Sequence, residues 1–468
     1  MFIFTEWIIL FGEGMMIFCG KKKLIMLNIA SLFFLSIYSN YSYCTKKNTV
    51  EIGIDRSNIN SQSWAMVPPS LPDAYPFSVK YSGSSHVLKE RRDSLISNIS
   101  KTGIGWFRDN LNGDPEILYE NIKMINSYGI KFLAVINPSK SDFSSSDYIS
   151  PEKSNCEYGV YPLSKIKLDL FERKLTKYLE LLSKRGISID AFEVGNELDL
   201  YCNNADMPDK NDFIYNKWKW FLSASQVEKF TAGYGPFLKR SVSVIRKYYP
   251  HSKIITFGMS NPTGNSASLI QALSEYKDDK GQVSDLTLLV DGYGTHLYPK
   301  GKTTSAMVND SISQLSSQAA LLPHLSEKGI WITEWNETAS AFWAGNKWYF
   351  QYKLNGEQGG DLNLKDDFGK YDAMSRAEVI KTFYNDVIKY LMNRPNTPVN
   401  IEKIFYYSYD YATFSRICDK SNFNKSIAKY FYNRNGTHSF GIGVCYSGII
   451  NPVNGEFRLD ILNALKQF

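Results

Sequence analysis

From residue 50 onward, short β-rich runs alternate with longer amphipathic stretches. The short runs predict strands, and the longer stretches predict helices because their apolar residues recur at helical spacing. The predicted strands are EIGIDR (51–56), GIGWFRDN (103–110), KFLAVINP (131–138), DAFEVGNE (190–197), KIITFGMS (253–260), LTLLVDGYGTHLYP (286–299), GIWITEWN (329–336) and KIFYYSYDY (403–411).

A helix is predicted after each strand. The second helix opens with Asp114-Pro115, an N-cap followed by proline at the first helical position. The third, LDLFERKLTKYLELLSKRG (168–186), ends on a glycine C-cap signal. The other helices are predicted over 88–100, 227–249, SLIQALSEY (268–276), a stretch ending at 328, 376–393 and FRLDILNALKQF (457–468).

This strict alternation of eight strand–helix units predicts the fold class. Alternating units require parallel strands joined by right-handed crossovers, and eight of them indicate an α/β fold, a (β/α)8 TIM barrel. A doubly wound sheet is the alternative, but no GxGxxG follows a strand and no GxxxxGK[ST] occurs. The long connections 139–165 and 337–375 are interpreted as βα loops on the catalytic face.

The N-terminus has the pattern of an export signal. Lys21-Lys22-Lys23 is a positive region, 24–38 an apolar region, and 39–42 a polar stretch suited to cleavage. The apolar region is short for a transmembrane helix, although an uncleaved N-terminal anchor stays open. We therefore expect residues 1–43 to be a signal peptide or signal-anchor, residues 50–468 to form the barrel domain, and the protein to be exported, periplasmic or secreted.

Charge and cysteine content limit the kinds of molecule that this protein is expected to bind. The net charge of +6 is small for 468 residues, with no dense Lys/Arg stripe beyond the N-terminus, so nucleic acid is not an expected partner. In an exported protein the cysteines suggest disulfides, and no CxxC or Cys/His cluster suggests a metal or other cofactor. In the proposed fold, Cys156 would pair with Cys202 and Cys418 with Cys445.

Two predicted strands end in a carboxylate. Glu197 ends the fourth strand and Glu334 lies near the end of the seventh, and in a barrel both would converge at the mouth, where the chemistry of this fold lies. Two facing carboxylates are the minimum machinery for glycoside hydrolysis, one as proton donor and one as nucleophile. A lone glutamate at a strand end is more often a solvated edge; two at matching ends favour catalysis.

The motifs at these strand ends resemble those of a known clan. Asn-Glu at 196–197, His-x-Tyr at 296–298 and Thr-Glu-Trp at 333–335 resemble the large clan of retaining (β/α)8 glycosidases. FEVGNE (192–197) resembles the FEVWNEP-type segment of glycoside hydrolase family 39, the xylosidase, iduronidase and exopolysaccharide-hydrolase group. GNE and the NETAS after Glu334 are also similar to the glucuronidase and heparanase family.

The resemblance implies a role for each matching residue. Glu197 would be the acid/base and Glu334 the nucleophile, with Arg108 keeping Glu334 ionised and Tyr298 donating a hydrogen bond to it. The remaining residues implied at the sugar site are Asn196 on the sugar 2-hydroxyl, His296, Trp335, and Tyr407 (with Tyr406) as an aromatic platform.

Structural interpretations stay open beside these roles. Arg108 could pair with Glu193 in the barrel floor, His296 could be a structural histidine, and Glu193 is interpreted as structural. Leu198 stands where the resemblance has proline, and Gly195 where it has an aromatic residue; both put the substrate in doubt rather than the reaction.

The predicted substrate is a poly- or oligosaccharide, with a cell-surface polysaccharide or an exopolysaccharide as the candidate. Aromatic residues in the loops after strands four and seven favour an extended ligand: Trp218, Trp220, Phe221, Phe342, Trp343, Trp348, Tyr349, Phe350 and Tyr352. A transglycosylase that remodels glycans and a non-catalytic carbohydrate-binding barrel are the alternatives.

Overall fold

The computed structural model describes residues 50–55, 103–111, 115–154, 159–208, 219–260, 265–299, 304–336, 376–407 and 459–467, with shorter stretches besides. The chain divides into two units, Met1–Thr49 and Val50–Phe468. In the first unit, strands β1 (Phe2–Phe4), β2 (Trp7–Leu10) and β3 (Met15–Phe18) form an antiparallel sheet. Residues 19–49, which hold most of the predicted signal, lie outside the described residues.

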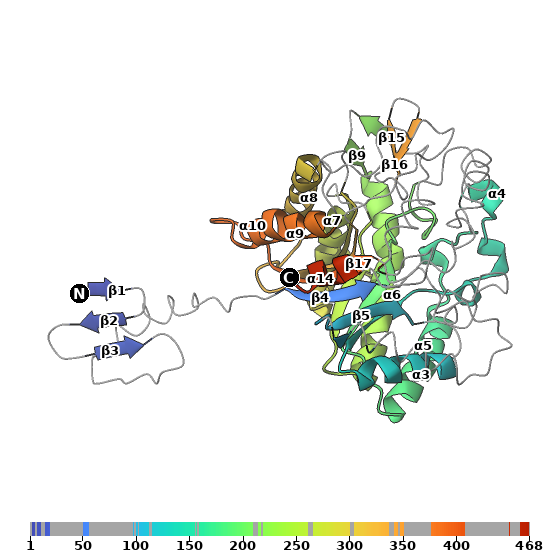
Figure 1. Cartoon of the computed structure of the whole chain (residues 1–468). Coiled ribbons are helices and arrows are strands. Elements are labelled where there is room, and N and C mark those ends of the chain that lie inside the picture. The colour runs from blue at the N-terminus through green and yellow to red at the C-terminus, as the bar shows by residue number, and fades with distance from the viewer. Residues whose placement is uncertain are drawn as a thin grey trace, which may run out of the picture. The chain divides into compact units, whose positions relative to one another are not determined.

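Eight parallel strands of the second unit close into a barrel, which confirms the predicted (β/α)8 fold (Figure 1). Each strand pairs with the next one along the barrel, and β17 pairs with β4 to close it. In chain order the strands are β4 (Glu51–Asp55), β5 (Trp106–Asn110), β6 (Lys131–Ile136), β7 (Ala191–Asn196), β10 (Lys253–Gly258), β13 (Gly292–Leu297), β14 (Gly329–Trp335) and β17 (Ile401–Tyr407).

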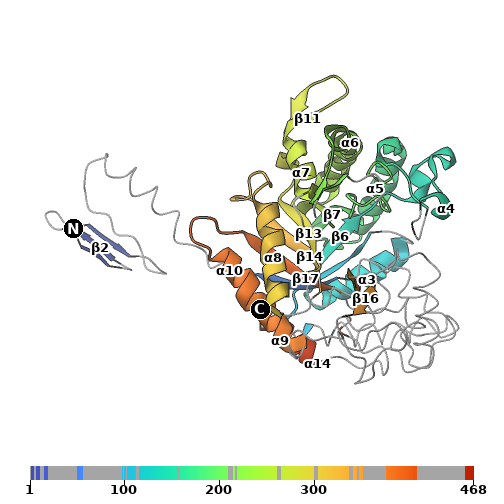
Figure 2. The same ribbon diagram turned by 90° about the horizontal axis from the view of Figure 1, so that it is seen from above.

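Helices lie outside the strands (Figure 2). They are α3 (Pro115–Ser127), α5 (Leu168–Lys184), α6 (Ala224–Tyr248), α7 (Asn265–Ala272), α8 (Thr304–Ala319), α9 (Arg376–Thr382), which continues through the π-helical turn η8 (Phe383–Ile388) into α10 (Lys389–Met392), and α14 (Leu459–Leu465). The helix predicted at 88–100 falls mostly outside the described residues. None of the helices described is long and apolar enough to cross a membrane.

One predicted strand is shorter than expected. The run 286–299 contains β13 only from Gly292, and its first part is the 3-10 helix η6 (Leu286–Leu289). Asp285 explains the difference, because its side chain accepts a hydrogen bond from Thr287 N at 2.9 Å and so caps the turn.

The barrel interior changes from apolar to polar along the strand direction. Its floor is a buried cluster of inward-facing residues: Trp106, Leu133, Ala191, Ile255, Trp331 and Phe405. Side chains two residues apart on a strand share a face, so Arg108 and Glu193 stand one layer above Trp106 and Ala191. Both are fully buried. Arg108 and Glu193 therefore lie directly above an apolar layer.

The predicted catalytic-face loops contain short elements of their own. Connection 139–165 holds the 3-10 turns η2 (Lys140–Asp142), η3 (Ser145–Asp147) and η4 (Leu163–Lys165) and the short helix α4 (Pro151–Ser154). Antiparallel hairpins follow β7 and β14: β8 (Ile214–Asn216) with β9 (Lys219–Phe221), and β15 (Ala341–Ala344) with β16 (Lys347–Phe350). The side chains of their aromatic residues lie outside the described residues.

Candidate active site

Arg108 is the centre of the charged cluster. Its side chain is fully buried and donates from Nε to Glu193 at 2.5 Å and from NH1 to Asp55 at 2.7 Å. Burial lowers the pKa of Arg108, but the carboxylates of Asp55, Glu193 and Glu334 outweigh it and raise that pKa well above its ordinary value. Arg108 therefore forms the ion pair with Glu193 that the sequence left open as an alternative role. It also reaches Glu334 at the mouth of the barrel.

Glu334 receives hydrogen bonds from two directions. Arg108 NH1 donates to its Oε1 at 2.9 Å, and the Tyr298 hydroxyl donates to its Oε2 at 2.6 Å. His296 Nδ1 lies 3.3 Å from the same Oε2. A cation and a hydroxyl donor therefore contact the Glu334 carboxyl, with the His296 ring beside it, which is an arrangement that favours the ionised form.

Glu197 lies opposite Glu334, with His296 between them. His296 Nδ1 is 2.9 Å from Glu197 Oε1, and one oxygen of each carboxyl and a ring nitrogen of His296 all lie within 4.8 Å of one another. His296 Nε2 faces Arg108 NH2 at 3.4 Å. Since a guanidinium can only donate, Nδ1 carries a hydrogen whether the ring is neutral or charged.

The surroundings of Glu197 and His296 raise the pKa of both groups. Burial raises the pKa of the Glu197 carboxyl, and the charges of Glu334 and Asp199 raise it further, against the lowering effect of the His296 hydrogen bond. Burial lowers the pKa of His296, but the carboxylates of Glu334 and Glu197 outweigh burial and raise it to about 9. Both shifts favour the protonated form, of Glu197 through burial first and of His296 through its carboxylate neighbours.

Asn196 joins this cluster to a chain of asparagines. Its Oδ1 accepts from Arg108 NH2 at 2.7 Å, so its amide nitrogen points away from the guanidinium. Its backbone N–H donates to Asn137 Oδ1 at 2.8 Å, and Asn137 Nδ2 donates to Asn110 Oδ1 at 3.0 Å. The ends of three neighbouring strands are thereby tied together.

The backbone at the end of β7 is unusual. Glu197 has φ 49° and Gly195 has φ 103°; a left-handed conformation costs a residue with a side chain on the order of 1–2 kcal/mol. A Cβ at Gly195 would lie 2.4 Å from Leu198 Cδ1 and 2.9 Å from Phe257 Cβ. The two departures from the resembling motif, Gly195 and Leu198, therefore pack against each other, and Leu198 fills the space that a larger residue at 195 would need.

Trp335 does not join the site, contrary to the role implied for it. The pairing of β14 with β13 and with β17 shifts register next to Glu334, so Glu334 faces the interior and Trp335 faces the helices. Trp335 is fully buried and stacks on Phe383 of η8 at 4.0 Å. On β17, Tyr406 packs edge-on against Trp335, while Tyr407 lies edge-on to Tyr298 at 5.7 Å.

Sequence reasoning missed three kinds of residue here. Asp55 ends the first strand and binds Arg108. Asn110 and Asn137 were also missed, although an Asn stands at or next to the end of three successive predicted strands. Gly258 is required because a Cβ there would lie 2.2 Å from His296 Nε2 and 2.5 Å from Glu193 Oε1; the only sequence signal was a glycine within the predicted strand 253–260.

Among the described residues, Glu197, His296 and Glu334 form the group whose spacing could suit a metal ion. In this structure His296 Nδ1 is already hydrogen bonded to Glu197, and Arg108 supplies positive charge to Glu334. The cluster thus has its own cationic and donor groups, and the donor set fits a carboxylate pair better than a metal centre.

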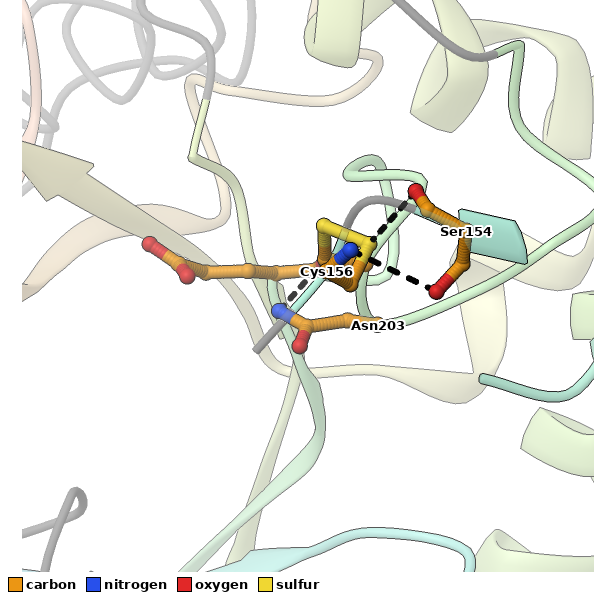
Figure 3. The surroundings of a disulfide bond; sticks show 5 residues. Ser154, Cys156 and Asn203 are labelled. Atoms are coloured by element: carbon orange, nitrogen blue, oxygen red, sulfur yellow. Dashed lines mark hydrogen bonds between the residues drawn. A yellow bond between two sulfur atoms is a disulfide. The ribbon is translucent and has the colours of Figure 1, made fainter. Parts of the chain in front are cut away.

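The predicted bond between Cys156 and Cys202 is confirmed, with Cα atoms 5.5 Å apart (Figure 3). It links connection 139–165 to the turn that follows Glu197. Cys418 and Cys445 lie outside the described residues, so their predicted pairing stays a prediction.

No protein-family model matches the sequence, and no curated protein matches it. Solved structures similar to this chain include a GH30 endoxylanase from Clostridium papyrosolvens C71 (14% identity over 69% of this chain and 64% of that one, TM-score 0.36). They also include fungal β-1,4-galactanases (11%, 80% and 91%, TM-score 0.44) and a GH10 endoxylanase from a sugarcane soil metagenome (12%, 90% and 98%, TM-score 0.41). The chain spans less than two thirds of the GH30 endoxylanase.

All three are glycoside hydrolases. At identities of 11–14% and TM-scores of 0.36–0.44 these three structures do not show membership of glycoside hydrolase family 39. The geometry of the cluster is therefore the basis for the function proposed next.

Proposed function

We propose that this protein is a retaining glycoside hydrolase that cleaves β-glycosidic bonds of a poly- or oligosaccharide. The observation that carries the proposal is the approach of the Glu197 and Glu334 carboxyls to within 4.8 Å. Retaining enzymes hold their two carboxyls roughly 5–5.5 Å apart, whereas inverting enzymes leave a wider gap for water. This short separation supports covalent attack by one of the two.

The environments of the carboxyls support different roles. In the first step Glu197 donates its proton to the leaving oxygen while Glu334 attacks the anomeric carbon and forms a glycosyl-enzyme intermediate. In the second step Glu197 takes a proton from the attacking water, and Glu334 leaves. The raised pKa of Glu197 suits the acid, and the Arg108 and Tyr298 contacts suit a nucleophile that stays ionised.

Neighbouring residues would bind the sugar. Arg108 occupies the Asn196 amide oxygen, so the amide nitrogen would be the group that donates to the sugar 2-hydroxyl. His296 would line the site while it holds Glu197, and Tyr407, 5% exposed beside Tyr298, would form part of the wall. We infer no binding role for Trp335.

We further propose export and an extracellular polysaccharide substrate. The Cys156–Cys202 bridge supports an oxidising compartment, in line with the expected N-terminal signal. FEVGNE supports kinship with glycoside hydrolase family 39, including its exopolysaccharide hydrolases.

The test follows the anomeric configuration of the first product by NMR, using an aryl β-glycoside selected from a panel. Retention is expected. Glu334→Gln should abolish turnover, and Glu197→Gln should slow glycosides with poor leaving groups far more than those with good ones. Glu180→Gln, on the outer face of α5, is the matched control. An inverted product, or a Glu197→Gln variant as fast as wild type on every leaving group, would contradict the assignment, and product chain lengths separate hydrolysis from transglycosylation.

A further inference from the structure

The backbone of Glu197 is held by three hydrogen bonds. Its N–H donates to Gly258 O at 2.9 Å, and its carbonyl accepts from Leu200 N at 3.0 Å and from Asn203 Nδ2 at 3.3 Å. A non-glycine residue in the left-handed region persists only where its surroundings impose that conformation. Asn203 supplies the side-chain part of this restraint.

Asn203 is itself anchored through the residue before it. Cys202 is bonded to Cys156, which lies 46 residues earlier in connection 139–165, and Figure 3 shows the Asn203 amide beside this bridge. Cys156 N donates to Ser154 Oγ at 3.4 Å. The bridge thus ties the position of Asn203 to a second loop.

The following residue strengthens the same connection. Asn204 is fully buried, donates from Nδ2 to Leu198 O at 3.1 Å, and accepts at Oδ1 from Leu163 N at 3.0 Å. Residues 197–204 are therefore fastened to the loop that precedes α5, and Asn203 is the member that acts on Glu197 directly.

We propose that Asn203 is a positioning residue for Glu197, and that the Cys156–Cys202 bridge fixes Asn203 in place for this task. The inference rests on the proposed role of Glu197 as the acid/base. Without the Asn203 hydrogen bond, the Glu197 backbone can relax out of its left-handed conformation, and its carboxyl moves relative to His296 Nδ1, now 2.9 Å away. A misplaced acid protonates the leaving oxygen poorly.

The test compares leaving groups. Asn203→Ala should reduce kcat/KM, which reports the first step alone, by about 10- to 100-fold on an aryl glycoside whose leaving group needs protonation, and by less than about 3-fold on the dinitrophenyl glycoside of the same sugar. A loss of folded protein would lower both rates equally. Asn203 is exposed, so the variant should fold; Asn203→Ser is a second variant whose hydroxyl is too short to reach the carbonyl.

Asn393→Ala is the matched control, because Asn393 Nδ2 also donates to a backbone carbonyl, that of Lys389 at 2.7 Å, at an exposed helix end. The control should leave both rates unchanged. Reducing the wild type with dithiothreitol, which can reach the exposed Cys202, should reproduce the selective loss, and reoxidation should restore activity. If reduction lowers neither rate, the part assigned to the bridge is wrong.

A substrate-free measurement separates this inference from the proposed function. The His296 Nδ1 proton should exchange faster with water in Asn203→Ala than in wild type, by NMR, because its bond to Glu197 is weakened. If wild type cleaves no glycoside but this exchange still accelerates, the proposed function fails and the positioning role stands. Unchanged exchange, or an equal loss on both leaving groups, overturns the positioning role.

Discussion

Replacing Glu334 by glutamine should lower the pKa values of both Glu197 and His296. The negative charge of Glu334 favours a bound proton on each neighbour and is one of the causes that raise both pKa values. Glutamine keeps the size of the side chain but removes the charge. The direction of both shifts is therefore fixed by one cause, and no substrate is needed to observe them.

The structure sets the size of the effect. The Glu197 and Glu334 carboxyls approach within 4.8 Å, and at an effective dielectric constant of about 20 two unit charges at that separation interact by ~3.5 kcal/mol. Since one pKa unit corresponds to about 1.4 kcal/mol, the full interaction equals ~2.5 units. Arg108 lies 2.9 Å from Glu334 and offsets part of its charge, so we expect the Glu197 pKa to fall by about 1–2 units.

Two NMR titrations would measure these shifts. The chain has five histidines, few enough for the 15N signals of His296 to be assigned through His296→Gln. The Glu197 signal in protein labelled with [δ-13C]glutamate is assigned through Glu197→Gln. Glu180→Gln controls for general effects. A Glu197 pKa that is unchanged or higher in Glu334→Gln would refute the direct coupling of the two carboxyls.

Three further predictions concern stability, each measured by chemical denaturation. Gly195→Ala should lower the free energy of unfolding by about 2–4 kcal/mol, because it combines a strained φ with the contact to Leu198. Gly195→Ala and Leu198→Ala together should cost less than the sum of the two single changes. Strict additivity would contradict the packing of the two residues. Arg108→Met should cost about 3–5 kcal/mol, because it leaves buried carboxylates without their cation, and a neutral effect would contradict this. Burial raises the pKa of Glu51, but hydrogen bonds led by that from Lys403 outweigh burial and lower this pKa to about 2. Since a carboxyl with a depressed pKa stabilises the fold above its unfolded pKa, wild type should lose stability between pH 5 and about 2 more steeply than Glu51→Gln. Parallel curves of stability against pH for the two proteins would contradict this.

The fold and the convergence of the two carboxylates could be predicted from the sequence because both depend on local pattern. A hydrophobic run that stops at Glu197 marks a strand end, and eight such runs mark a barrel. The arrangement around Glu334 depends on register instead. Strict alternation would leave Trp335 facing the interior, and a register shift beside Glu334 turns it outward, which no local pattern shows.

Contacts between residues that are far apart in the sequence were equally hard to predict. Asp55 and Arg108 are 53 residues apart and meet at 2.7 Å because their strands are neighbours. The 3-10 turn capped by Asp285 competes with a strand over the same apolar residues. In each case a contact made only in the folded chain decides the outcome.

The mutual fit of Gly195 and Leu198 has a consequence for how the ancestry of this chain is traced. A large side chain at 195 cannot be introduced while Leu198 Cδ1 stands 2.4 Å from the place of its first carbon, so the residues tolerated at the two positions depend on each other. A comparison that weighs each position by itself counts two differences where the fold made one adjustment. A score that treats positions 195 and 198 as independent will therefore overcount the difference between this segment and one with a large residue at 195.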